Sequence, residues 1–176
     1  MWPTLARAID FVLALQDDSG AVFWARDPGG RVWPAPLLAG CASIFGSLGC
    51  AAAIAERLDR DAGEWRRARA RLGEAVRLRP ELFRDAPVPE PPGRYAMDWY
   101  YPVLGGVLRG DDGRRRLVSG HADFIDEGGG CRCVRDRAWF TVAETCELVI
   151  ALSISELHEQ AHALYEWAQT LRCEDG

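Results

Sequence analysis

The amino-acid sequence predicts an all-α fold built from helical hairpins. A helix with an ordinary amphipathic stripe, a loop rich in Gly, Pro, Asp and Trp, and a nearly uncharged helix follow one another three times, and a fourth amphipathic segment then begins. The amphipathic segments start near residues 4, 61, 111 and 156, a spacing typical of repeats whose neighbouring helices bury each other's apolar faces. The 176 residues, of which 48% are hydrophobic, suit one globular domain or a piece of something larger.

The first two hairpins are expected between residues 3 and 76. Leu5, Ile9 and Val12 form the apolar stripe of a helix over residues 3–15. Residues 17–36 are expected to be a loop, whose last prolines suit the start of the next helix. That uncharged helix covers 35–55, and an amphipathic helix covers 61–76.

The uncharged segment is long enough to cross a bilayer. Gly, Ala and Ser dominate it, and an amphipathic unit follows at once. Because a helix that is hydrophobic all round can also form the core of a large protein, the sequence predicts a buried helix and no membrane span.

The third hairpin begins after a proline-rich segment. Residues 78–93 contain five prolines and are expected to be a long ordered loop, because apolar side chains within it can be buried. Pro102 would break a helix interior, so Asp98 is expected to be the N-cap, which places Pro102 in the first turn. Further helices are expected over residues 111–125, 139–153 and 156–172.

Charge and cysteine usage narrow the functional classes. The net charge is -5, and all 21 basic residues are arginines, whereas a nucleic-acid-binding domain is usually basic overall. The sequence shows no secretory signal, and most of its six cysteines lie in apolar stretches, so reduced thiols in a cytoplasmic protein are expected. Cys131 and Cys133 could bind zinc, but a C-x-C pair is a poor clamp, so buried thiols are favoured over a metal site.

Residues 11–24, FVLALQDDSGAVFW, contain Q-x-x-x-G followed by an aromatic residue. This pattern resembles the glutamine-tryptophan repeat of terpenoid cyclases and protein prenyltransferases. The segments SLGCAAAIAERL, RYAMDWYYPVLGGVL, CRCVRDRAWFTVAET and WAQTLRCEDG are similar to stretches of actinobacterial prenyltransferase-like proteins. The resemblance spans almost the whole chain and implies a single α/α toroid domain over residues 1–176. With about three and a half hairpins, the ring would be incomplete at the C-terminus.

Two motifs of those enzymes are missing from the chain. A cyclase of this type is expected to carry a D-x-D-D general acid, and none is present. The Asp, Cys and His that bind zinc in protein prenyltransferases cannot be mapped onto this sequence. Toroids of this kind also serve glycosidases, epimerases and lanthionine cyclases, so the resemblance implies the fold more strongly than the activity.

Candidate site residues lie in the loops and at the starts of the expected inner helices. Six of them are predicted to gather at one rim: Asp98, Trp99, Tyr101, Asp136, Arg137 and Glu144. The candidate catalytic carboxylates are Asp98, Asp136 and Glu144. Aromatic faces can stabilise a carbocation, bind an isoprenoid tail or stack on a sugar, and arginine can bind an anion. The candidate substrate-binding residues are Trp24, Trp99, Tyr101, Arg137 and Trp139. The sequence does not identify a cofactor.

Glu144 has two interpretations. Thr141 and Glu144 match a capping box, in which the carboxylate would have only a structural role. Asp136 is an equally good cap. A helix that begins there would place Glu144 two turns inside an apolar helix, where a carboxylate needs a partner such as Arg137 and has a perturbed pKa.

Three functions are compatible with these features. The first, favoured by the resemblance, is a prenyltransferase-like or terpenoid-cyclase-like protein that binds an isoprenoid at the centre of the toroid. The second is a carbohydrate-active toroid with paired carboxylates such as Asp98 and Glu144, and the third is a non-catalytic toroid that binds a partner. A partial ring would leave inner helices open, so self-association or membership of a longer toroid is expected.

Overall fold

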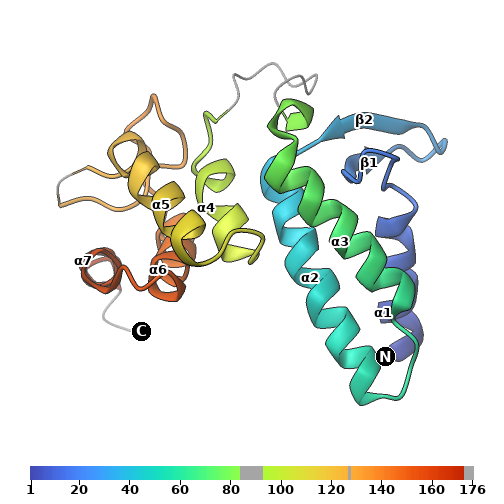
Figure 1. Ribbon diagram of the computed structural model, residues 1–176. Helices are drawn as coiled ribbons and strands as arrows, with labels where there is room; N and C mark the ends of the chain where they lie inside the picture. Colours follow the sequence, from blue (N-terminus) through green and yellow to red (C-terminus); the bar gives the residue numbers. More distant parts are fainter. Residues whose placement is uncertain (84–92, 127, 173–176) are drawn as a thin grey trace. The chain divides into compact units, whose positions relative to one another are not determined.

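The computed structural model describes residues 1–83, 93–126 and 128–172 (Figure 1). These residues form seven α-helices, one short 3-10 helix and one two-stranded sheet, so the prediction of a mainly helical protein is confirmed. Every expected helix is present, with ends shifted by a few residues. The helices are α1 (Trp2–Leu13), α2 (Leu38–Arg57), α3 (Gly63–Leu78), η1 (Pro80–Phe83), α4 (Ala96–Leu104), α5 (Gly110–Phe124), α6 (Val142–Ile154) and α7 (His158–Gln169).

The chain divides into two compact units. Unit 1 comprises Met1–Pro89 and Gly105–Val107, and unit 2 comprises Glu90–Leu104 and Leu108–Gly176. The single toroid domain therefore remains a prediction, and each unit is described here by itself.

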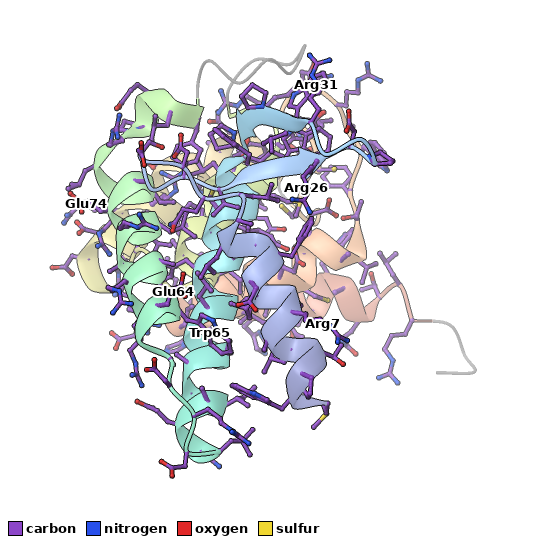
Figure 2. The ribbon with its side chains drawn as sticks, turned by 90° about the vertical axis from the view of Figure 1, so that its right-hand side faces the viewer. Arg7, Arg26, Arg31, Glu64, Trp65 and Glu74 are labelled. Atoms are coloured by element: carbon purple, nitrogen blue, oxygen red, sulfur yellow. The ribbon has the colours of Figure 1, made fainter. Side chains whose placement is uncertain are left out.

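In unit 1, α1, α2 and α3 lie side by side (Figure 1). Small residues let α2 and α3 approach closely, since a Cβ added to Gly73 would lie 2.6 Å from the ring of Phe45. Arg69 also lies over that ring, with its guanidinium carbon 3.8 Å from the ring centroid. Trp65 projects from α3 (Figure 2) and packs against Trp2 of α1, with ring centroids 5.6 Å apart.

The long apolar helix α2 is buried on one face only. It is the one helix within the described residues that is long and apolar enough to cross a membrane, and 39% of its most apolar window is buried. Its buried residues include Cys41, Phe45 and Leu48, whereas Ser47, Cys50 and Ile54 are exposed. The prediction of a buried helix therefore holds for the face that packs on α3, and not for the whole circumference.

The expected loop over residues 17–36 contains a β-hairpin. Strands β1 (Phe23–Arg26) and β2 (Val32–Pro36) pair in antiparallel fashion, with Ala25 opposite Trp33. The prediction of a loop was wrong because two prolines in β2 were taken as the start of a helix. A sheet of two strands has only edges, where a proline removes no necessary hydrogen bond.

Gln16 connects the end of α1 to α3. Its Nε2 donates hydrogen bonds of 2.9 Å to the carbonyl oxygens of Gly20 and Ala68, and its Oε1 accepts one of 2.6 Å from Arg71. Gly20 has φ +87°, and a Cβ there would lie 2.6 Å from the Arg71 carbonyl oxygen. The Q-x-x-x-G pattern is therefore explained by a structural connection between two helices.

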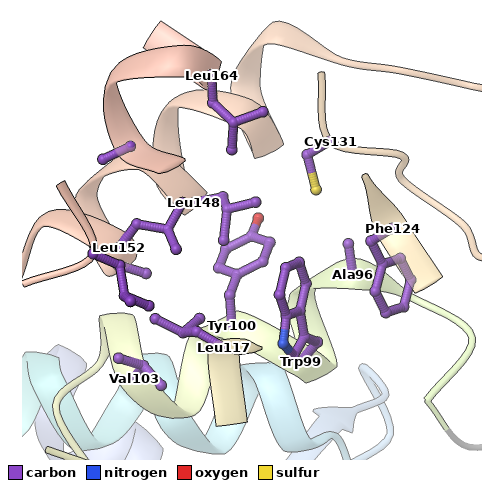
Figure 3. Packing of buried hydrophobic residues seen from close by; sticks show 13 residues of the cluster. Ala96, Trp99, Tyr100, Val103, Leu117, Phe124, Cys131, Leu148, Leu152 and Leu164 are labelled. Atoms are coloured by element: carbon purple, nitrogen blue, oxygen red, sulfur yellow. The ribbon is translucent and has the colours of Figure 1, made fainter. Parts of the chain in front are cut away.

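In unit 2, α4 packs against α5 and α6, and α6 packs against α7. Figure 3 shows Tyr100 of α4 among Trp99, Leu117 and Leu148. Trp99 stacks on Phe124 of α5, with ring centroids 5.4 Å apart. The core of this unit is therefore built around the aromatic side chains of α4.

Helix α4 begins at Ala96, so the prediction that Asp98 is its N-cap is wrong. Pro102 consequently lies inside the helix, where it has no N–H for the carbonyl oxygen of Asp98, four residues earlier. Arg116 of α5 replaces this donor, with its Nη2 2.6 Å from the Asp98 carbonyl oxygen and its Nε 2.7 Å from that of Trp99. A side chain from another helix thus allows α4 to continue through the proline.

We expect Arg116→Met to lower the free energy of unfolding by about 1–3 kcal/mol, because a half-buried carbonyl group then lacks its donor. Pro102→Ala restores a backbone N–H, so this second change should cost less in the Arg116→Met protein than in the wild type. Urea unfolding of the wild type, Arg116→Met, Pro102→Ala and the double variant measures the coupling between the two residues. Strictly additive costs would contradict the role assigned to Arg116.

Candidate functional site

Residues 131–135 join the starts of α4 and α6. The N–H of Ala96 donates to the carbonyl oxygen of Cys133 at 3.0 Å, and the N–H of Thr141 donates to that of Cys131 at 3.3 Å. Val134 also forms a β-bridge with Tyr95. The first turns of two helices distant in sequence therefore meet at one segment.

Thr141 caps α6, so the alternative start at Asp136 is wrong. The Thr141 hydroxyl oxygen accepts a hydrogen bond of 3.2 Å from the N–H of Glu144. Buried Thr145 strengthens this turn, because its hydroxyl donates to the Thr141 carbonyl oxygen at 2.7 Å and accepts from the Cys131 N–H at 2.9 Å. Since the Thr141 N–H already donates to Cys131, the Glu144 carboxylate is left for other contacts.

Two glutamates of α6 lie among neutral hydrogen-bond donors. Glu144 lies beside the thiol of Cys133, and Glu147 accepts hydrogen bonds from Tyr100 at 2.6 Å and Tyr101 at 2.9 Å. Residues three apart on a helix share a face, with Cβ atoms about 5–6 Å apart. We call Tyr101, Cys133, Glu144 and Glu147 the acidic site. All four side chains are partly buried.

Neither glutamate forms an ion pair with an arginine within the part of the chain that the structure describes. This is notable in a chain with 21 arginines. Close to the segment of residues 131–135, three ion pairs are formed: Arg132–Asp126, Arg135–Asp123 and Arg94–Asp136. The acidic site is therefore a place of uncompensated negative charge beside aromatic rings.

The donors of the acidic site remain protonated at neutral pH. Burial, followed by the hydrogen bond to Glu144, raises the pKa of Cys133 to about 11. Burial, followed by the hydrogen bond to Glu147, raises the pKa of Tyr101 to about 12 and also raises the pKa of Tyr100. Glu147 is thus held by two hydroxyl groups, and Glu144 lies beside a thiol, none of which ionises in the physiological range.

Alkaline pH should weaken unit 2. The pKa of Tyr101 is raised from 10.0 to about 12 on folding, so its contribution to stability is complete below pH 10 and is lost as the pH rises through 12. We expect the free energy of unfolding to fall over this window, and to fall less in Tyr101→Phe. Equal decreases in both proteins, measured by urea unfolding across the window, would refute this assignment.

Sequence reasoning missed Glu147. It follows Glu144 by three residues on an otherwise uncharged helix, and this spacing was the available signal. Its two tyrosine partners lie 47 and 46 positions earlier in the chain. The helical spacing could have suggested a pair of carboxylates, but only the packing of α4 on α6 identifies what holds Glu147.

Three predicted site residues lie on the exposed segment before α6. Asp136 is exposed and paired with Arg94, with Nε and Oδ1 3.1 Å apart, and the hydrogen bond from Arg94 lowers the pKa of that carboxyl. Arg137 is exposed, and Trp139 is 60% exposed. The carbonyl oxygen of Trp139 accepts a hydrogen bond of 2.8 Å from the Cys133 N–H, which places this residue beside the acidic site.

Three further predicted residues are not among the four of the acidic site. Asp98 is in the first turn of α4 and interacts electrostatically with Arg116. Trp99 is 6% exposed and forms part of the core. Trp24, which is 53% exposed, lies on β1 of unit 1. Among the described residues, no group of three or more His, Cys, Asp or Glu side chains could hold a metal ion.

No family model matches the chain. The chain is similar to a curated protein of Mycolicibacterium hassiacum named MMP endo-(1,4)-3-O-methyl-alpha-D-mannosidase. The two sequences are 46% identical over 180 residues, which cover 100% of this chain and 47% of that protein. The chain thus spans about half the length of the curated relative that it matches.

The name of this relative is that of a glycosidase, so the assignment to prenyltransferase-like proteins and terpenoid cyclases was wrong. The physical reason lies in the motif that supported it. Gln16 and Gly20 connect two helices, a role that says nothing about the ligand. Of the functions compatible with the sequence, the comparison favours the carbohydrate-active one.

Proposed function

We propose that this chain is part of a glycoside hydrolase that cleaves (1,4)-linked 3-O-methyl-α-D-mannosides internally. The observation that carries the proposal is the 46% identity to the mannosidase along the whole chain. The acidic site supports it, because glycoside hydrolysis requires carboxyl groups beside a sugar and proceeds through an oxocarbenium-like transition state. The acidic site offers carboxyl groups beside aromatic rings. Its uncompensated negative charge suits an oxocarbenium-like transition state, which is positively charged.

We further propose that the helices belong to an α/α toroid. Three pairs support this arrangement: α2 follows α1, α4 follows α3, and α6 follows α5, each pair separated by a loop. The fourth amphipathic helix, α7, repeats the pattern of α1, α3 and α5. In such a ring the starts of α4 and α6 would face the substrate, and the exposed apolar residues Val142, Ile150 and Ile154 of α6 would meet further helices or a second copy.

Glu144 is the candidate for one of the two reacting carboxyl groups. It has no arginine partner among the described residues, whereas Asp136 is held as a carboxylate by Arg94. A general acid must be able to carry a proton, and an arginine partner opposes this. Asp98 is the candidate for the second carboxyl group, since it precedes Tyr101 by three residues and so shares a helix face with it.

The test is incubation of the protein with a (1,4)-linked 3-O-methyl-α-D-mannose oligosaccharide, with separation of the products by chromatography and measurement of binding by calorimetry. We expect binding and internal cleavage. Geranylgeranyl diphosphate serves as the control ligand and should not raise the melting temperature. An oligosaccharide that is neither bound nor cleaved would overturn the proposal.

A further inference from the structure

Glu147 holds the hydroxyl groups of two adjacent tyrosines with one carboxylate. Its Oε2 accepts from Tyr100 at 2.6 Å, and its Oε1 accepts from Tyr101 at 2.9 Å. The two rings lie with their centroids 5.3 Å apart. Tyr100 is 0% exposed, whereas Tyr101 is only partly buried. Tyr100 therefore anchors Glu147 to the core of unit 2, and Glu147 in turn orients Tyr101 at the edge of the acidic site.

Packing alone does not require a carboxylate at this position. A partly buried charge loses solvation, and an apolar side chain of similar volume would avoid that cost. Two phenol hydroxyls offset part of it, but no arginine does so among the described residues. A carboxylate here contributes two things that an apolar side chain lacks: it orients the Tyr101 hydroxyl, and it places a second negative charge one helical turn from Glu144.

We infer that Glu147 is a positioning residue of the proposed mannosidase site, acting through Tyr101 and Glu144 without touching the reacting atoms. The inference rests on the proposed function. Positive charge develops on the sugar in the transition state, so a fixed negative charge nearby stabilises the transition state more than the bound substrate. Loss of Glu147 should therefore lower kcat and leave KM nearly unchanged.

The first experiment compares Glu147→Gln, Tyr101→Phe and the double variant with the wild type on the 3-O-methyl-mannoside. Glutamine keeps the size of the side chain and one acceptor oxygen but removes the charge. We expect Glu147→Gln to lower kcat by at least about tenfold and to change KM by less than about threefold. The double variant should lose no more than Glu147→Gln, because Glu147 orients Tyr101 and its loss already removes the contribution of Tyr101.

Cys146→Ala is the matched control, since this exposed residue neighbours Glu147 on α6. It should keep the wild-type kcat. A wild type that cleaves the mannoside together with an unchanged kcat in Glu147→Gln would overturn the positioning role. A fall in kcat that Cys146→Ala shows equally would also overturn it, because the effect would then reflect damage to the helix.

The second experiment is independent of catalysis. Ultraviolet phenolate absorbance of each protein, compared with that of the same protein carrying Tyr101→Phe, separates the ionisation of Tyr101 from that of the other tyrosines. The pKa of Tyr101, about 12, depends partly on Glu147. Glu147→Gln should let this tyrosine ionise at lower pH than in the wild type. If the wild type cleaves no mannoside, the proposed function fails, and an unchanged tyrosine titration would separately refute the contact between Glu147 and Tyr101.

Discussion

Glu144→Gln is expected to lower kcat on the 3-O-methyl-mannoside by about 10²–10⁴-fold, the usual contribution of a positioned acid or base. The amide has nearly the same volume as the carboxyl group but cannot exchange a proton with the glycosidic oxygen or with water. The N-cap of α6 should persist, because Thr141 accepts from the backbone N–H of Glu144 and not from its side chain.

Steady-state kinetics and the melting temperature together check this prediction. Asp136→Asn is the comparison, because Asp136 is exposed and paired with Arg94. It should lower kcat by less than about tenfold, since a surface ion pair contributes little. Near-wild-type kcat in Glu144→Gln, or a larger loss in Asp136→Asn, would remove Glu144 from the reaction.

Trp99→Ala should lower the free energy of unfolding by about 3–5 kcal/mol, as expected when a large buried aromatic side chain is truncated. The side chain is 6% exposed and stacks on Phe124. Its indole N–H also donates to the Arg116 carbonyl oxygen at 2.8 Å. Gly120 of α5 leaves the space that the indole occupies, because a Cβ there would overlap the ring, so alanine at position 99 creates a cavity.

Urea unfolding followed by far-ultraviolet circular dichroism measures this loss. Trp139→Ala removes the same type of side chain from a position that is 60% exposed, and its effect should stay within about 0.5 kcal/mol. Equal losses in the two variants would contradict the distinction between a core tryptophan and a surface one.

Local sequence was sufficient to predict the helices of this protein. The apolar stripe of α1 and the charge-free run of α2 depend on the spacing of residues along the chain, and helical periodicity translates such spacing directly into a buried face. The same applies to the cap at Thr141, whose partner Glu144 is three residues away. Glu144 could also be identified as a candidate, since a carboxylate on an apolar helix is unusual.

Tertiary structure alone decided what these side chains contact. Gln16 meets Ala68, Arg116 meets Asp98, and Glu147 meets both tyrosines of α4. Each of these partners comes from another helix, so no local pattern specifies the contact. For this reason the N-cap prediction for Asp98 failed: the donor that lets α4 continue through Pro102 lies on α5. For the same reason a glutamine that connects two helices was mistaken for the mark of a prenyltransferase-like protein, and Glu147 was missed.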